Sequence, residues 1–210
     1  IQLDASRVYM ALNKPIGVIS SMADEFGRPD LSQYALRSDR IYNVGRLDAD
    51  TSGLLILTND GELANMLAHP KFGVTKTYVA KVEGSVTAQE INKLTSGIEL
   101  EDGMMNADKA TLIDSNPFES LVEIVIHSGK NRVVRRMFEA LGHPVKDLVR
   151  RQFGPVHLGP LKPGQTRLLS KVEVGALLKS AEDKQQRAPR PRSKGGQTVK
   201  AKPKGRRSGV

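Results

Sequence analysis

One polar turn between two apolar runs constrains this 210-residue chain more than any other segment. The first run begins at Ile41. The second run, residues 54–57, is four consecutive Leu or Ile residues that stop at Asn59-Asp60-Gly61. A short apolar run bounded by turn residues indicates a strand buried on both faces. Residues 46–52 are therefore predicted to form a turn between two buried strands, where a rigid scaffold can hold reactive side chains in place.

Two simpler interpretations of this turn need to be considered. Its aspartates can cap the turn through their own side chains, and periodicity alone favours that role. The pattern Asp48, Asp50, Ser52, Gly53 also matches the start of a calcium loop. The twelfth position of such a loop should be a bidentate Glu, but here it is Asn59. Because a strand rather than a helix is expected after Gly53, we exclude calcium.

The composition limits the other classes of site. The chain has no Cys and four scattered His, which excludes disulfides and thiolate metal sites and gives no metal-ligand spacing. No apolar run approaches the length that spans a bilayer, and no secretory signal is visible. We expect a cytoplasmic protein that uses no metal and no cofactor and does not contact a membrane.

The net charge of +9 is concentrated at one end of the chain. Residues 184–210 hold ten of the 32 Lys and Arg and no Asp or Glu, whereas residues 1–183 hold 22 basic and 23 acidic residues. The last segment is also rich in Pro, Gly and Ser and has few apolar residues, so it cannot form a core. We predict a folded domain over residues 1–183 and a disordered basic tail over 184–210, which we interpret as an arm that binds polyanions.

Alternating short strands and helices predict an α+β domain with a mixed, largely antiparallel sheet. No G-x-G-x-x-G motif supports a dinucleotide-binding fold. The expected strands are 8–13, 17–20, 41–44, 54–58, 76–82, 109–113, 121–127, 148–153 and 165–169. The expected helices are 62–68 with Asp60 as its cap, 88–97 with a Thr87/Glu90 capping box, 131–141 and 172–180.

The predicted helix 131–141 has a buried face and an unusual charge distribution. Its apolar residues recur at the spacing of one helix face. Four cations surround its first turn and a half: Lys130, Arg132, Arg135 and Arg136. Cations at a helix N-terminus oppose the helix dipole, so local stability does not explain them. We expect anionic partners, either RNA phosphates or a carboxylate such as Asp48, with a solvated basic face as the equal alternative.

The turn Gly45-Arg46-Leu47-Asp48 and its flanking runs resemble the signature of the RNA pseudouridine synthases, in particular the RsuA/RluB type that modifies ribosomal RNA. The resemblance implies the pseudouridine synthase fold with a central RNA-binding cleft, and it implies that Asp48 is the catalytic residue. Enzymes of this branch usually carry an N-terminal S4-type RNA-binding domain, which nothing here matches. We therefore expect this chain to be a catalytic domain.

Three further segments resemble motifs of the same family. In Lys76-Thr77-Tyr78, the resemblance makes Tyr78 the active-site tyrosine, whereas strand periodicity alone makes it a half-buried core aromatic. In the segment 127–137, it implies that Arg135 contacts the catalytic aspartate. In the segment 12–20, Lys14-Pro15 forms a structural turn with Lys14 as a helper near the site.

These observations predict an isomerase that converts a uridine of ribosomal RNA, of the large subunit rather than the small, to pseudouridine with an aspartate nucleophile. We expect a monomer whose partner is pre-ribosomal large-subunit RNA. A noncatalytic ribosome-assembly factor on the same fold is the alternative; a glycoside hydrolase would need paired carboxylates and an aromatic-rich groove. The expected RNA-binding residues are Arg46, Lys14, Lys130, Arg132, Arg136, Arg150 and Arg151.

Overall fold

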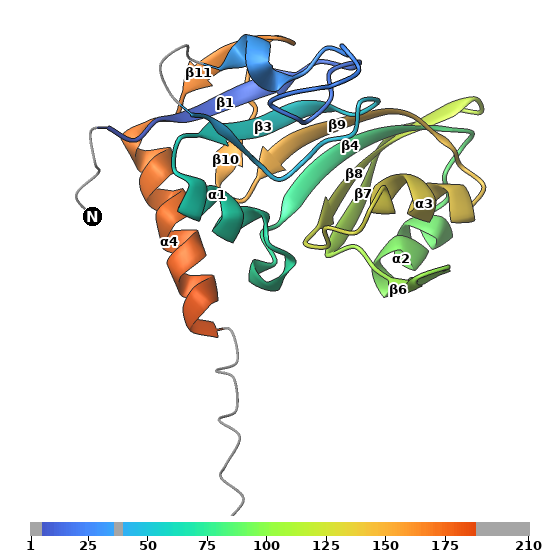
Figure 1. Ribbon diagram of the computed structural model, residues 1–210. Coiled ribbons are helices and arrows are strands. Elements are labelled where there is room, and N and C mark those ends of the chain that lie inside the picture. The colour runs from blue at the N-terminus through green and yellow to red at the C-terminus, as the bar shows by residue number, and fades with distance from the viewer. Residues whose placement is uncertain (1–5, 36–39, 188–210) are drawn as a thin grey trace, which may run out of the picture.

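The computed structural model describes residues 6–35 and 40–187, with side chains up to Ser180. Within these residues the chain forms an α+β domain, as predicted (Figure 1). The strands are β1 (Tyr9–Lys14), β2 (Tyr42–Val44), β3 (Ser52–Thr58), β4 (Lys76–Glu83), β5 (Ile98–Leu100), β6 (Gly103–Met105), β7 (Lys109–Ser115), β8 (Glu119–Ile126), β9 (Val145–Phe153), β10 (Val156–His157) and β11 (Thr166–Leu168). The helices are α1 (Gly61–Ala68), α2 (Ala88–Ser96), α3 (Val133–Ala140) and α4 (Lys171–Arg187), with 3-10 turns at Leu31–Tyr34 and Pro70–Phe72.

One large mixed sheet forms the centre of the described domain. Its strand order is β11-β1-β3-β9-β4-β8-β7, with β10 paired to β9 and β2 paired to β3. Among the described strands, β3 and β9 form the one parallel pair, through Ser52↔Val149 and Gly53↔Arg150. The remaining ladders are antiparallel, which confirms the predicted mixed, largely antiparallel sheet.

The strand β3 is buried on both faces, as its unbroken apolar run indicated. Leu54 and Ile56 pack with the apolar residues of α1 and α4. Leu55 and Leu57 lie in the other core cluster, which includes Leu31 and Ile41 from the long segment between β1 and β2 and also extends to α2 and α3. Figure 1 shows α1 and α4 beside the β1–β3 half of the sheet, and α2 and α3 beside the β4–β7 half.

The parallel junction between β3 and β9 requires a glycine. Gly53 has a φ of +107°, and a Cβ at this position would overlap the backbone of Arg150. Any other residue here would be strained and would also push the two strands apart. This close approach places the Asp48 turn, which comes immediately before β3, over the middle of the sheet.

Two of the four predicted helices begin with the expected caps. Asp60 accepts a hydrogen bond from Leu63 N at the start of α1, and the Thr87/Glu90 capping box is complete at α2. Val134, Met137 and Phe138 of α3 are buried, as predicted. The helix α4 continues to Arg187, beyond the predicted end at Ser180 and into the predicted tail. Residues 188–210 lie outside the described residues.

The prediction of a strand over residues 17–20 is wrong. Gly17 N donates to Ala49 O at 2.7 Å, and Ile19 N donates to Pro29 O at 2.9 Å. The backbone of this segment therefore bonds to two loops and does not pair with a neighbouring strand. The short strands β5, β6 and β10 were not predicted, because two or three residues carry no measurable periodicity. No helix in the described part of the chain is long and apolar enough to span a membrane.

Candidate active site

The Asp48 turn is held by its own backbone and by the segment that follows β1. Thr51 N donates to Asp48 O at 3.0 Å, and Gly17 N donates to Ala49 O at 2.7 Å. The hydroxyl of Ser20 donates to Leu47 O at 2.7 Å and accepts from Leu47 N at 3.0 Å. These contacts hold the turn between β2 and β3 independently of the side chains from α3.

Arg132 joins the two carboxylates of the turn. Its guanidinium makes a bidentate pair with Asp50 at 3.0 and 2.8 Å, and its Nη1 lies 3.5 Å from Asp48 Oδ2. The hydrogen bond from Arg132 is the main cause that lowers the pKa of Asp50 below its usual value, and the charges of Arg135 and Arg132 add to it. Arg132 is the residue before α3 and adopts a φ of +47°, the one positive φ found at a non-glycine residue of the described chain.

The structure corrects the predicted partner of Arg135. Its Nη2 donates to Asp50 O at 2.7 Å and its Nη1 to Val145 O at 3.2 Å, while its Nε lies 3.3 Å from the carboxylate of Asp50. No contact between Arg135 and Asp48 is present among the described residues, and Arg132 contacts Asp48 instead. Arg135 therefore supports the backbone of the turn at Asp50.

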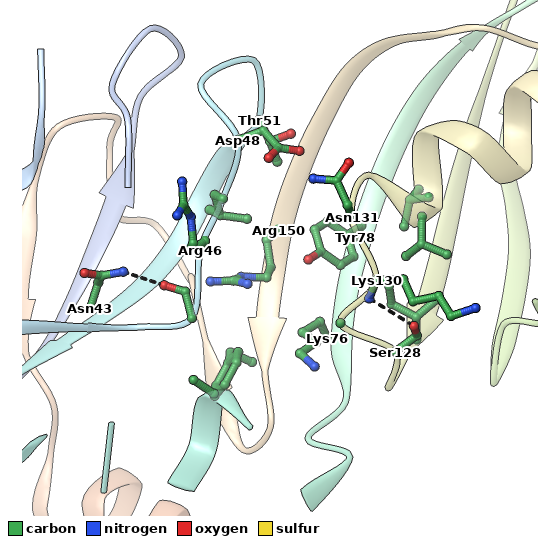
Figure 2. A pocket seen from close by; sticks show the side chains of 18 of the residues that line it. Asn43, Arg46, Asp48, Thr51, Lys76, Tyr78, Ser128, Lys130, Asn131 and Arg150 are labelled. Atoms are coloured by element: carbon green, nitrogen blue, oxygen red, sulfur yellow. Dashed lines mark hydrogen bonds between the residues drawn. The ribbon is translucent and has the colours of Figure 1, made fainter. Parts of the chain in front are cut away.

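A pocket of about 760 Å³ opens beside the turn. Its lining includes residues of α1, of β4 and β9, and of the N-terminal end of α3. It also includes seven residues that the sequence singled out: Arg46, Asp48, Tyr78, Lys130, Arg132, Arg135 and Arg150. Figure 2 shows Asp48 at one end of the pocket, with Arg46 and Tyr78 on either side of Arg150.

Tyr78 combines both of its predicted roles. It is 9% exposed and belongs to a core cluster together with Ala80 and Val82, which share its strand face. It also lines the pocket and lies directly across from Arg150 in the β4–β9 register. A tyrosine held this firmly by the core presents a fixed ring surface to the pocket.

Lys14 does not contact solvent, contrary to its predicted place among the RNA-binding residues. It is 0% exposed, and its ammonium donates to Val18 O at 2.6 Å and to Pro15 O at 3.0 Å. Burial lowers its pKa from 10.5 to about 8, although the negative charges of Asp48 and Asp50 favour the protonated form. Lys14 thus stabilises the backbone of residues 15–18, the segment that contacts the Asp48 turn.

The four cations around α3 have carboxylate partners within the protein, and two of them, Lys130 and Arg132, are also exposed to solvent. Lys130 and Arg136 both bind Asp102, in the turn between β5 and β6, at 3.5 and 2.8 Å. Arg136 is not part of the pocket lining. Arg151 is exposed and also lies outside the lining, whereas its neighbour Arg150 is buried within it.

A comparison with family models identifies residues 8–140, more than half of the chain, as an RNA pseudouridylate synthase. The chain belongs to this family. A protein named an uncharacterized RNA pseudouridine synthase, from Mycobacterium tuberculosis, is 48% identical over 181 residues, which are 84% of this chain and 71% of that protein. The ribosomal large subunit pseudouridine synthase B of Bacillus subtilis is 47% identical over 173 residues, 81% of this chain and 71% of that protein.

A solved pseudouridylate synthase has the same fold. It superimposes with a TM-score of 0.72 at 31% identity, covering 82% of this chain and 74% of that chain. Membership of the RNA pseudouridylate synthase family and this fold agree with the resemblance seen in the Gly45-Arg46-Leu47-Asp48 turn. The predictions of family, enzyme class and fold are confirmed.

Several residues of this pseudouridylate synthase line the pocket without having been proposed for it. Thr51, Lys76, Ser128 and Asn131 are among them, and Arg150, which was expected as an RNA-binding residue, is buried in the lining. Thr51 Oγ1 and Arg150 Nη2 are buried and have no hydrogen-bond partner among the described residues. Lys76 could have been proposed from its place in the Lys76-Thr77-Tyr78 motif. The sequence around Arg150 is basic and gave no indication that this residue is buried. No group of three metal-binding side chains was found in the described chain.

Proposed function

We propose that this synthase converts a uridine of ribosomal large-subunit RNA to pseudouridine, with Asp48 as the nucleophile. The observation that carries the proposal is the convergence of Asp48, Arg46 and Tyr78 on one pocket in a member of this family. The name of the Bacillus subtilis relative, which is 47% identical, supports the large subunit as the source of the RNA.

The reaction moves one bond of the nucleoside and needs no exchange of electrons. The N1–C1′ glycosidic bond breaks, the freed uracil turns, and a C5–C1′ bond forms in its place. The proton on C5 is then lost and N1 gains one, so the product is an isomer of the substrate. A carboxylate such as Asp48 can carry the covalent step, because it lies at the end of the pocket, where an entering nucleoside would meet it.

Side chains around Asp48 suit an everted nucleotide. Moving a base out of its stack costs a few kcal/mol, which contacts in the pocket must offset. Arg46 is exposed beside the pocket, where it can occupy the space that the base leaves. The ring of Tyr78 can stack on the uracil, a contact worth roughly 1–3 kcal/mol per base in other proteins.

The decisive experiment compares Asp48→Asn with Asp50→Asn. Both changes remove one negative charge from the same turn, and both keep the size of the side chain. We expect Asp48→Asn to lower the single-turnover rate on unmodified large-subunit RNA by roughly 1,000-fold or more, with RNA affinity near that of the wild type. Asp50→Asn should retain measurable turnover, because Asp50 does not line the pocket.

Pseudouridine mapping in ribosomal RNA from cells with and without the gene gives the second readout. The loss of one large-subunit site would support the proposal. If the wild-type protein binds this RNA but modifies none of its uridines, the protein is an assembly factor and the proposal is wrong. Equal loss of turnover and affinity in Asp48→Asn would mean that Asp48 is structural.

A further inference from the structure

Arg150 is a buried cation with few partners in the protein. It lies on β9 in the middle of the sheet and is 2% exposed. Its Nε donates to Leu54 O at 2.7 Å, and its guanidinium carbon lies 5.2 Å from the centre of the Phe153 ring. Its Nη2 is buried without a hydrogen-bond partner among the described residues. A guanidinium has five N–H donors and no acceptor, so Arg150 has more donors than this environment has acceptors for them.

Arg135, the neighbouring arginine of the pocket, has more partners than Arg150. It is 11% exposed at its side chain and donates to two backbone carbonyls, and its Nε, although it makes no hydrogen bond, lies 3.3 Å from the carboxylate of Asp50. Arg150 has no carboxylate partner of this kind. Because buried polar groups are normally paired and an unpaired donor costs stability, an underused arginine in a pocket indicates a ligand that supplies the missing acceptor.

The position of Arg150 limits what that ligand can be. Arg150 and Tyr78 face each other across the β4–β9 pair, and side chains in such positions lie side by side on the sheet. Figure 2 shows Arg150 next to Tyr78 and below Asp48. A planar ring stacked on Tyr78 would therefore present one of its edges to Arg150.

We infer that Arg150 donates a hydrogen bond to a carbonyl oxygen of the target uracil and thereby orients the base under Asp48. The inference rests on the proposed function. Uracil has two carbonyl oxygens, O2 and O4, and a charged donor makes a short, strong bond to either. The everted base is the part of the nucleotide that enters the pocket, whereas the phosphates stay with the strand near the exposed Arg46. A neutral acceptor also avoids placing a second anion beside Asp48.

The first test is Arg150→Met, which keeps most of the side-chain length and removes every donor. Lys146→Met is the matched control, because Lys146 is an exposed cation on the same strand and lies outside the pocket lining. We expect Arg150→Met to lower the single-turnover rate on unmodified large-subunit RNA roughly 10- to 100-fold. Its melting temperature should fall less than that of Arg135→Met, because only Leu54 O loses its side-chain donor and a buried, poorly paired cation is removed. The control should match the wild type in both measurements.

The second test changes the substrate and leaves the protein intact. RNA carrying 2-thiouridine or 4-thiouridine at the mapped target offers sulfur, a weaker acceptor, at one of the two positions. We expect one of these substitutions to slow the wild type and to have no further effect on Arg150→Met. That coupling identifies which carbonyl Arg150 binds, and it does not require the variant to be as stable as the wild type.

Three outcomes would overturn the inference and leave the proposed function intact. They are wild-type turnover in Arg150→Met, no slowing of the wild type by either thio-substituted RNA, and a flatter salt dependence of RNA binding in Arg150→Met than in Lys146→Met. The last outcome would mean that Arg150 contacts a phosphate. By contrast, an inactive wild-type protein on unmodified RNA would overturn the proposed function itself.

Discussion

Arg132 and Arg135 reach the same turn from neighbouring positions and hold different parts of it. Arg132 lies just before α3, is 41% exposed at its side chain, and bridges Asp48 and Asp50. Arg135 lies inside the helix and binds the backbone carbonyls of Asp50 and Val145. The exposed arginine thus sets the charge near the carboxylates, whereas the buried one sets the position of the chain that carries them.

This division predicts different costs for the two arginines. Arg135→Met leaves two carbonyl groups without donors, so we expect the free energy of unfolding to fall by about 2 kcal/mol. Arg132→Met removes an exposed ion pair and should cost less than about 1 kcal/mol. Urea unfolding of both variants measures the difference, and turnover should fall in both. Equal stability losses would contradict the assignment of roles.

Sequence reasoning recovered the members of this site better than their contacts. The Gly45-Arg46-Leu47-Asp48 turn and Tyr78 could be singled out from motifs, and both line the pocket. The partner of Asp48 was predicted wrongly because Arg132 adopts a φ of +47° that no local pattern specifies. That backbone conformation directs Arg132 to the carboxylates, and it depends on tertiary contacts across more than 80 residues of chain.

At the scale of elements, the pairing of β3 with β9 connects the two halves of the sheet. The strands on one side are β1, β2 and β11, and those on the other are β4, β7 and β8. The pairing runs through only two register pairs, at Ser52 and Gly53. This pairing brings Asp48, in the turn before β3, and Arg150, on β9, into one pocket. The site therefore depends on this short junction.

Gly53→Ala tests the junction. A Cβ at residue 53 would overlap the Arg150 backbone and would also sit at a φ of +107°. We expect a loss of at least about 3 kcal/mol in the free energy of unfolding, from strain and strand separation together. Gly103→Ala is the control, because Gly103 has a φ of +105° but open space around it. Strain alone should cost the control roughly 1–2 kcal/mol; a similar loss in both would mean that the close approach is unimportant.

Local patterns predicted the long elements and missed the connections between them. The run 54–57 and the alternation at residues 76–82 lie in β3 and β4, as expected. Residues 17–20 read as a strand but form turns, because Lys14 and Ala49 take the hydrogen bonds that a ladder would need. The parallel approach of β3 and β9 joins segments almost 100 residues apart, which periodicity cannot indicate.

At the scale of the whole molecule, charge is distributed unevenly along the chain. Residues 1–183 carry 22 basic and 23 acidic residues, and the cations around α3 are paired with Asp50 and Asp102. The cations around α3 are therefore largely neutralised within the protein and add little to the nonspecific attraction of RNA. Residues 184–210 carry ten cations and no acid, so we propose that they supply most of the salt-dependent affinity.

Truncation after Arg187 separates this attraction from catalysis. The cut keeps all of α4 and removes eight of the ten cations, those beyond residue 187. Each phosphate contact that is lost should lower the salt slope of RNA binding by roughly 0.7–0.9, up to about 7 in total. The turnover rate at saturating RNA should stay within a factor of about two, because the Asp48 pocket is intact. A full-length control with these eight cations replaced by Gln should reproduce the lower slope. An unchanged slope in both proteins would assign the affinity to the folded domain, and Arg46 and Arg132 would then be the next residues to replace.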